Sequence, residues 1–177
     1  MQKIIVEFDE ELRDLRDLLA ARHGRLVLVE SCTAGLVCSL LGKIPGISQY
    51  LCGSMVVYRN DSKHQWLGIE TAKLDDPNVG PVSGIVTQEL AEAVLKRTPE
   101  ATLVAAITGH LGPGAPSEFD GRIYICVHHR DSEQPYDTSE HRLSTAPAVD
   151  LDDWTARQFR QIEAARILIL ALRRSLK

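Results

Sequence analysis

Several features are missing from this sequence of 177 residues, and each absence excludes a class of protein. No apolar run approaches the roughly 20 residues of a membrane span, and residues 1–7 have too short an apolar core for a signal peptide. The charges form no long run of one sign, and the formal net charge of -4 gives no electrostatic reason to expect nucleic-acid binding. We therefore expect a soluble, cytoplasmic protein with neither a membrane nor a nucleic-acid partner.

Motifs for metals and cofactors are also missing. The six histidines show no H-E-x-x-H pattern, and no C-x-x-C spacing occurs among the four cysteines, Cys32, Cys38, Cys52 and Cys126. A chain of this length can bury a sizeable core, so we expect reduced, partly buried thiols rather than disulfides. The sequence predicts no metal and no cofactor.

The apolar pattern predicts helices that alternate with strands in one domain, residues 1–177. Helices are predicted over 9–23, after Thr33, after Ser83 and over 151–176; strands are predicted over 26–29, 55–58, 102–108 and 122–127, with 138–143 as an antiparallel return. The near-continuous apolar run 102–108 is typical of a strand covered on both faces. We therefore expect an α/β fold, a three-layer α/β/α sandwich with a mixed, mostly parallel sheet.

Residues 30–35 lie where the first predicted strand turns into a helix. The N–H groups at a helix start have no partner within the helix, and the helix dipole there favours negative charge. A hydroxyl at this point can become a stabilised alkoxide, so Ser31 is a candidate nucleophile. Two alternatives stay open. In the first, Ser31 or Thr33 simply caps the helix, which the local pattern alone favours. In the second, Cys32 is the nucleophile, because a thiol beside a helix start can have a lowered pKa.

Polar residues also follow the next two predicted strands: Tyr58 and Lys63 after the second, Thr108 at the end of the third. The carboxyl ends of parallel strands share one edge of a sheet, where we expect these groups to meet Ser31. The chain has no convincing Ser/His/Asp order, so Lys63 is the candidate base if its pKa is lowered by burial or nearby positive charge. Tyr58 can relay a proton. On composition alone, an exposed tyrosine and a solvated lysine are the simpler interpretations.

The glycine-rich turn 109–114 lets the backbone approach a ligand, and its N–H groups are candidates for holding a phosphate or an oxyanion. The turn matches neither the Walker loop nor G-x-G-x-x-G. The alternative is an ordinary tight connection in which His110 is structural or exposed.

Taken together, these segments resemble the CinA C-terminal domain family, whose active members are nicotinamide-nucleotide amidases. Residues 30–35 look like the family's E-S-C-T-G-G, residues 44–48 resemble V-P-G-S-S, residues 58–63 follow Y-x-N-x-x-K, and residues 108–114 are similar to T-G-I-A-G-P-G. The resemblance covers most of the chain and is closest to the stand-alone form of the family.

The resemblance implies hydrolysis of the carboxamide of nicotinamide mononucleotide to nicotinic acid mononucleotide and ammonia, without a metal. It makes Ser31 the nucleophile, Lys63 the general base and Tyr58 the residue that orients or relays between them. Arg157 and Arg160 stay open as alternatives for binding the phosphate. The residues it implies for substrate binding are Thr33, Gly35, Ser48, Asn60, Thr108, Gly109, Gly112, Gly114, Arg157 and Arg160. The expected partners are a small-molecule nucleotide and further copies of the chain, as a homodimer or higher homo-oligomer.

The sequence departs from the family pattern at several positions. Ala34 replaces a glycine, which matters if that position needs a positive φ. Ile47 replaces a serine, residues 115–120 differ from the usual glycine-rich continuation, and His110 and Leu111 add bulk to the glycine-rich turn. The second hypothesis is therefore a nucleotide-binding or regulatory domain that keeps the pocket without turnover.

Overall fold

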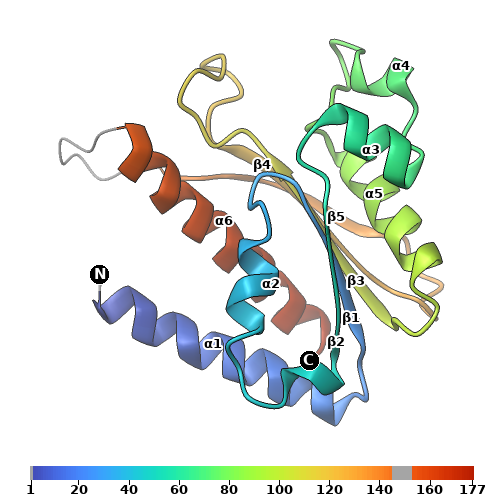
Figure 1. Ribbon diagram of the computed structural model, residues 1–177, viewed down its shortest axis with the longest axis vertical. Coiled ribbons are helices and arrows are strands. Elements are labelled where there is room, and N and C mark those ends of the chain that lie inside the picture. Colours follow the sequence, from blue (N-terminus) through green and yellow to red (C-terminus); the bar gives the residue numbers. More distant parts are fainter. Residues whose placement is uncertain (1, 145–152) are drawn as a thin grey trace.

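The computed structural model describes residues 2–144 and 153–177 and shows a central sheet with helices on both of its faces (Figure 1). The elements along the chain are α1 (Gln2–Ala21), β1 (Leu26–Glu30), α2 (Leu36–Leu41), the 3₁₀ helix η1 (Ile47–Gln49), β2 (Leu51–Val56), α3 (Asn60–Leu67), α4 (Thr71–Leu74), α5 (Gly84–Arg97), β3 (Leu103–Gly109), β4 (Arg122–His129), β5 (Asp137–Arg142) and α6 (Asp153–Ser175).

The sheet has the strand order β2-β1-β3-β4-β5. Strand β1 is parallel to β2 and β3, whereas β4 is antiparallel to both β3 and β5. The sheet is therefore mixed, as expected, and every strand except β4 runs in the same direction. The carboxyl ends of β1, β2 and β3 lie at one edge of the sheet, the edge at which the candidate site was expected.

Two hydrophobic clusters fill the space between the layers. On one face, α1, α2 and α6 pack on the sheet through residues such as Leu15, Leu41 and Leu168. On the other face, Leu90 of α5 packs in a cluster with Val104 of β3. Residues 103–107 are buried because β3 lies in the middle of the sheet, covered on both sides. The three-layer α/β/α arrangement is thus confirmed.

The structure shifts some element boundaries from those predicted. Strand β2 begins at Leu51 and ends at Val56, so Tyr58 lies in the following loop rather than in the strand. The early part of β2 was missed because Gly53 interrupts its apolar pattern with an open, positive-φ backbone position. In the described ranges, no helix is long and apolar enough to cross a membrane.

Candidate active site at the carboxyl edge of the sheet

Ser31 follows β1 directly and is held in a tight turn at the carboxyl edge of the sheet. Its backbone N–H donates to the carbonyl of Ile107 in β3 at 3.1 Å, and its carbonyl accepts from the N–H of Ala34 at 3.1 Å. The side chain is largely buried, with 6% of its surface exposed. Its hydroxyl makes no hydrogen bond to another side chain or backbone group among the described residues, so it is available for a ligand.

The neighbouring Glu30 carries a fully buried carboxylate that organises the turn. Three backbone N–H groups and two hydroxyls donate to it. The donors are Thr33 Oγ1 (2.8 Å), Gly35 N (3.1 Å) and Val37 N (3.0 Å) to Oε2, and Cys38 N (3.0 Å) and Ser54 Oγ (3.0 Å) to Oε1. Glu30 therefore joins the end of β1 to the start of α2 and to β2. Glu30 is a functional residue that was missed from the sequence; its signal there is a lone carboxylate that ends an apolar strand before a helix start.

The hydrogen bonds of Glu30 correct two expectations about the start of α2. The N–H groups of Gly35, Val37 and Cys38 bind Glu30, and that of Leu36 donates to the Thr33 carbonyl, so the helix start has no free N–H group for an alkoxide. Thr33 does not cap the helix either, because its buried hydroxyl donates to Glu30 and the N-cap position is Gly35.

Two successive left-handed residues shape the turn behind Ser31. Ala34 has φ +53° and Gly35 has φ +92°. A left-handed conformation costs an L-residue about 1–2 kcal/mol. Position 34, where the family has glycine, therefore has a backbone conformation that favours glycine. Ala34 accepts this strain while keeping the turn.

Lys63 lies in the first turn of α3 and is almost completely buried, with 2% of its surface exposed. Its ammonium group forms no ion pair or hydrogen bond with the described residues. Burial lowers the pKa of Lys63 below its usual value of 10.5, and the Cys32 thiol opposes this shift only in part. The direction of this shift is the one that a lysine base requires.

The buried thiol of Cys32 is influenced by several charges at this edge. Those of Lys63 and Arg157 act to lower its pKa, but their effect is smaller than that of burial. Burial, helped by the charge of Glu30, raises the pKa of the Cys32 thiol to about 12. The thiol is thus fully protonated near neutral pH, which argues against Cys32 as the nucleophile.

Arg157 of α6 connects two loops of the site. One guanidinium nitrogen donates to the Tyr58 hydroxyl at 2.8 Å, and another donates to the carbonyl of Gly112 in the glycine-rich turn. Arg157 pairs with no carboxylate among the described residues. Tyr58 itself is 54% exposed.

Arg160, one helical turn later, has a different environment. It forms a two-pronged ion pair with Asp120, with both N···O distances 2.7 Å, and it donates to the Leu111 carbonyl at 3.3 Å. The hydrogen bonds from Arg160 lower the pKa of Asp120. The two arginines that the sequence left open therefore differ: Arg160 is paired with Asp120, whereas Arg157 has no carboxylate partner in the described ranges.

The glycine-rich turn lies between two open cavities of about 410 and 340 Å³ that both contain Arg157. Gly114 lines both cavities. A side chain at Gly112 would displace the ion pair of Asp120 and Arg160, because its Cβ atom would lie 2.7 Å from Asp120 Oδ1 and 2.8 Å from Arg160 Nη1, and the φ of +63° would also be strained. Gly109 is equally restricted, since its Cβ would lie 2.5 Å from Ile123 Cγ2.

The two bulky residues that depart from the family pattern in this turn face different surroundings. Leu111 is buried in the core cluster beneath α6, with 2% exposed. The half-buried His110 lies beside the ring of Phe119, with ring centroids 5.7 Å apart. Burial, and then the charge of Arg122, lower the pKa of His110, so it is uncharged at neutral pH.

Thr108 and Asn60 both lie at this edge, but they differ in their exposure to solvent. Thr108 is fully buried and hydrogen-bonds to Thr87 Oγ1 at 2.7 Å. Thr87 donates its own proton to the Ser83 carbonyl, so Thr108 must be the donor and has no proton left for a substrate. It joins β3 to α5. Asn60 is exposed at the start of α3.

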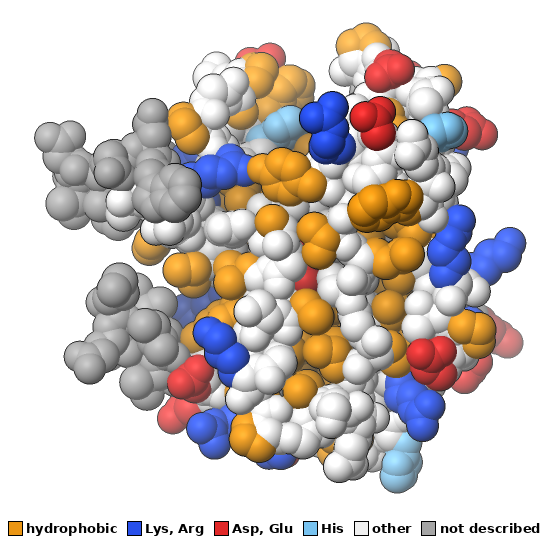
Figure 2. Space-filling model, viewed as in Figure 1, with side chains coloured by type: hydrophobic (Ala, Val, Ile, Leu, Met, Phe, Trp, Pro, Cys, Tyr) orange, Lys and Arg blue, Asp and Glu red, His pale blue; other side chains and the backbone are white. Residues whose placement is uncertain are grey.

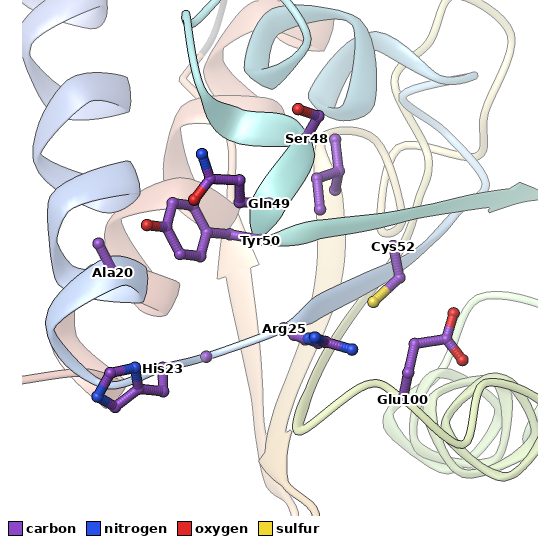
Figure 3. Close-up of a pocket in the computed structure, with 10 residues that line it drawn as sticks. Ala20, His23, Arg25, Ser48, Gln49, Tyr50, Cys52 and Glu100 are labelled. Carbon is purple, nitrogen blue, oxygen red and sulfur yellow. The ribbon is translucent and has the colours of Figure 1, made fainter.

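Ser48 is not brought to this site, which corrects its expected place beside the substrate. It lies in η1, just before β2, whereas Ser31 follows the other end of the neighbouring strand β1. The physical reason is that β2 runs parallel to β1, so the residues before β2 lie at the amino edge. There, Ser48 lines a separate cavity of about 740 Å³ with Arg25 and Tyr50 (Figure 3).

The described residues were also compared with the ligand sets that hold metal ions. Over residues 2–144 and 153–177, no three His, Cys, Asp or Glu side chains lie close enough together to hold a metal ion.

Comparison with solved structures shows the same fold in two bacterial proteins. The chain superposes with a TM-score of 0.81 on competence damage-inducible protein A from Klebsiella pneumoniae, at 20% identity and with 96% of each chain covered. A competence/damage inducible protein from Agrobacterium tumefaciens gives a TM-score of 0.75 at 27% identity, with 93% of this chain and 94% of that chain covered.

Sequence relatives agree with this comparison. A CinA-like protein from Mycobacterium marinum is 41% identical over 124 residues, which is 68% of this chain and 28% of the relative. A putative competence-damage inducible protein from Moorella thermoacetica is 38% identical over 64% of this chain and 27% of the relative. The chain thus matches between a quarter and a third of the length of these relatives. The model of the CinA C-terminal domain matches residues 9–147. The chain therefore belongs to the CinA C-terminal domain family.

Proposed function

We propose that this protein is an amidohydrolase that converts nicotinamide mononucleotide to nicotinic acid mononucleotide and ammonia. The observation that carries the proposal is Lys63, a buried amine with a lowered pKa and no acidic partner among the described residues. It follows the carboxyl end of β2, at the same edge of the sheet as Ser31. A serine and an unprotonated amine are the groups that acyl transfer without a histidine requires. Membership of the CinA family supports the proposal.

In the proposed reaction, the Ser31 oxygen attacks the carboxamide carbon while its proton passes to the Lys63 amine. The carbonyl oxygen becomes an oxyanion, and the backbone N–H group of Thr33 is a donor close to Ser31 that binds no protein group in the described residues. The C–N bond then breaks, and Lys63 returns the proton to the leaving ammonia. Water, deprotonated by Lys63, hydrolyses the acyl-enzyme and frees Ser31.

Arg157 and Tyr58 complete this proposal. Because Arg157 has no carboxylate partner in the described structure, its charge suits the nucleotide phosphate better than that of Arg160. Tyr58 accepts a hydrogen bond from Arg157, so its own proton remains available for donation toward the reacting groups. The nucleotide would thus lie between the Ser31 turn and the glycine-rich turn.

The test is to incubate the purified protein with nicotinamide mononucleotide and to measure ammonia and nicotinic acid mononucleotide. Ser31→Ala should abolish release, whereas Cys32→Ala should retain it, because the buried thiol takes no part. Undiminished release by Ser31→Ala would refute the proposal. If calorimetry detects nucleotide binding by a wild-type protein that releases no ammonia, the chain is instead a nucleotide-binding regulatory domain.

A further inference from the structure

Gln161 of α6 contacts the turn that carries Ser31, although the two are far apart along the chain. Its side-chain nitrogen donates to the Thr33 carbonyl at 3.0 Å and to the Cys32 carbonyl at 3.4 Å. Both acceptors are carbonyl oxygens, so the NH2 end of the amide must face the turn. Among the described residues, the Cys32 carbonyl receives no other hydrogen bond. Gln161 therefore binds a carbonyl that the turn itself leaves without a donor.

The turn is held from two sides, and neither side uses an ion pair. The carboxylate of Glu30 accepts from its N–H groups, whereas Gln161 donates to its carbonyls. Residues 31–42 contain no charged side chain, so they can form no ion pair of their own. In the view of Figure 1, Figure 2 shows charged side chains mostly around the rim of the molecule and almost none over α2. The hydrogen bonds from Glu30 and Gln161 are thus the polar contacts that fix this turn to other parts of the fold.

A fixed turn matters because Ala34 has a strained backbone, with φ +53°. Such a conformation persists only where the surrounding contacts hold it in place. Ala34 directly follows Thr33, whose carbonyl binds Gln161. Without this bond, the peptide group before Ala34 is free to rotate and relieve the strain, and that rotation displaces the preceding Ser31.

Gln161 also links the Ser31 turn to the other parts of the site. Arg157 lies four residues earlier in α6, so the two side chains project from the same face of the helix. Arg157 donates to the Tyr58 hydroxyl and to the Gly112 carbonyl of the glycine-rich turn. One helix therefore sets the position of the serine relative to the glycine-rich turn.

We propose that Gln161 is a positioning residue, which holds the Ser31 hydroxyl in the geometry for attack on the substrate. The proposal rests on the role of Ser31 as the nucleophile in the proposed function. An amide neither gains nor loses a proton near neutral pH, so Gln161 acts through the turn and not as an acid or a base. A misplacement of about 1 Å can slow a reaction about 100-fold. Loss of Gln161 should therefore lower kcat, whereas KM depends mainly on contacts such as that of Arg157.

The kinetic test replaces Gln161 by methionine, which has a similar length but cannot donate. Gln161→Met should lower kcat for ammonia release from nicotinamide mononucleotide about 10–100-fold and change KM by less than about twofold. The matched control, Gln158→Met, makes the same change at an exposed position of α6 and should keep the wild-type kcat. Adding Ala34→Gly to Gln161→Met should restore most of the lost kcat, because glycine adopts a positive φ without strain. A kcat equal to that of the control, or no recovery with Ala34→Gly, would overturn the proposal.

Hydrogen exchange tests the same role without catalysis. The N–H groups of Ala34 and Leu36 are bonded to carbonyls within the turn. In Gln161→Met they should exchange about tenfold faster than in Gln158→Met, because the turn opens more often. Equal exchange rates would overturn the proposal, and circular dichroism establishes that both variants are folded. If wild type releases no ammonia, the proposed function fails, but the exchange rates still decide whether Gln161 holds the turn.

Discussion

Replacing Glu30 by glutamine tests the role of the buried carboxylate, because the two side chains have nearly the same shape. The glutamine oxygen can take the Oε2 position, where Thr33, Gly35 and Val37 donate. Its NH2 group then takes the Oε1 position and faces the N–H of Cys38, a donor against a donor. The hydroxyl of Ser54 can rotate and accept instead.

The expected loss of stability follows from these contacts. A buried donor left without an acceptor costs about 1–3 kcal/mol, and the remaining bonds weaken because a neutral acceptor binds about half as strongly as a charged one. We expect Glu30→Gln to lower the free energy of unfolding by about 2–4 kcal/mol, and Glu30→Ala to lower it further, since all five donors then lose their acceptor.

Urea unfolding followed by circular dichroism measures this difference. The control is Glu133→Gln, which removes the same charge from an exposed loop position and should change the free energy of unfolding by less than about 0.5 kcal/mol. If Glu30→Gln is as stable as this control, Glu30 does not organise the turn, and the reasoning is wrong.

Three further substitutions probe the same edge of the sheet. Ala34→Gly should raise the free energy of unfolding by up to about 1 kcal/mol in urea, because relief of the positive φ exceeds the added freedom of the unfolded chain; a lower stability would contradict this. Lys63→Met should slow ammonia release about 10²–10⁴-fold. It should also be more stable than wild type at neutral pH. This gain in stability over wild type should shrink toward pH 10.5. The reason is that wild type becomes more stable as the pH rises from the lowered pKa of Lys63 in the folded protein to its usual value in the unfolded chain. A difference that does not depend on pH would refute the burial argument. Arg157→Lys should raise KM about tenfold without loss of stability. Arg160→Lys should lower the free energy of unfolding in urea by about 1 kcal/mol, because it weakens the pair with Asp120. Equal effects of the two substitutions in both assays would show that the arginines are not distinct.

The local sequence was sufficient for features that depend on neighbouring residues. The unbroken apolar run from residue 102 predicts a strand covered on both faces, and β3 is such a strand. The helix predicted after Ser83 is α5, and the Ser83 hydroxyl caps it by accepting from the N–H of Val86 at 3.3 Å. The antiparallel return after β4 is also present as β5. Periodicity and capping act over a few residues, so they can be read along the chain.

Contacts between distant segments decided the chemistry of the site. The sequence proposed Ser31 and Lys63, but only the fold buries Lys63 and lowers its pKa. Nothing local separates Arg157 from Arg160; their partners, Tyr58 and Asp120, lie 99 and 40 residues away along the chain. The position of Ser48 also depends on the fold. Because it precedes β2, which is parallel to β1, it lies at the opposite edge of the sheet from Ser31.

The sequence by itself determined the order of helices and strands, the turn that presents Ser31 and the family to which the chain belongs. The tertiary structure alone decided which N–H groups, charges and cavities surround that serine. The reason is physical: the backbone pattern follows from short-range geometry, whereas burial and hydrogen-bond partners depend on how the sheet brings remote segments together. Glu30 shows the difference most clearly, because its carboxylate fills the helix start that the sequence had left open for a reacting oxygen.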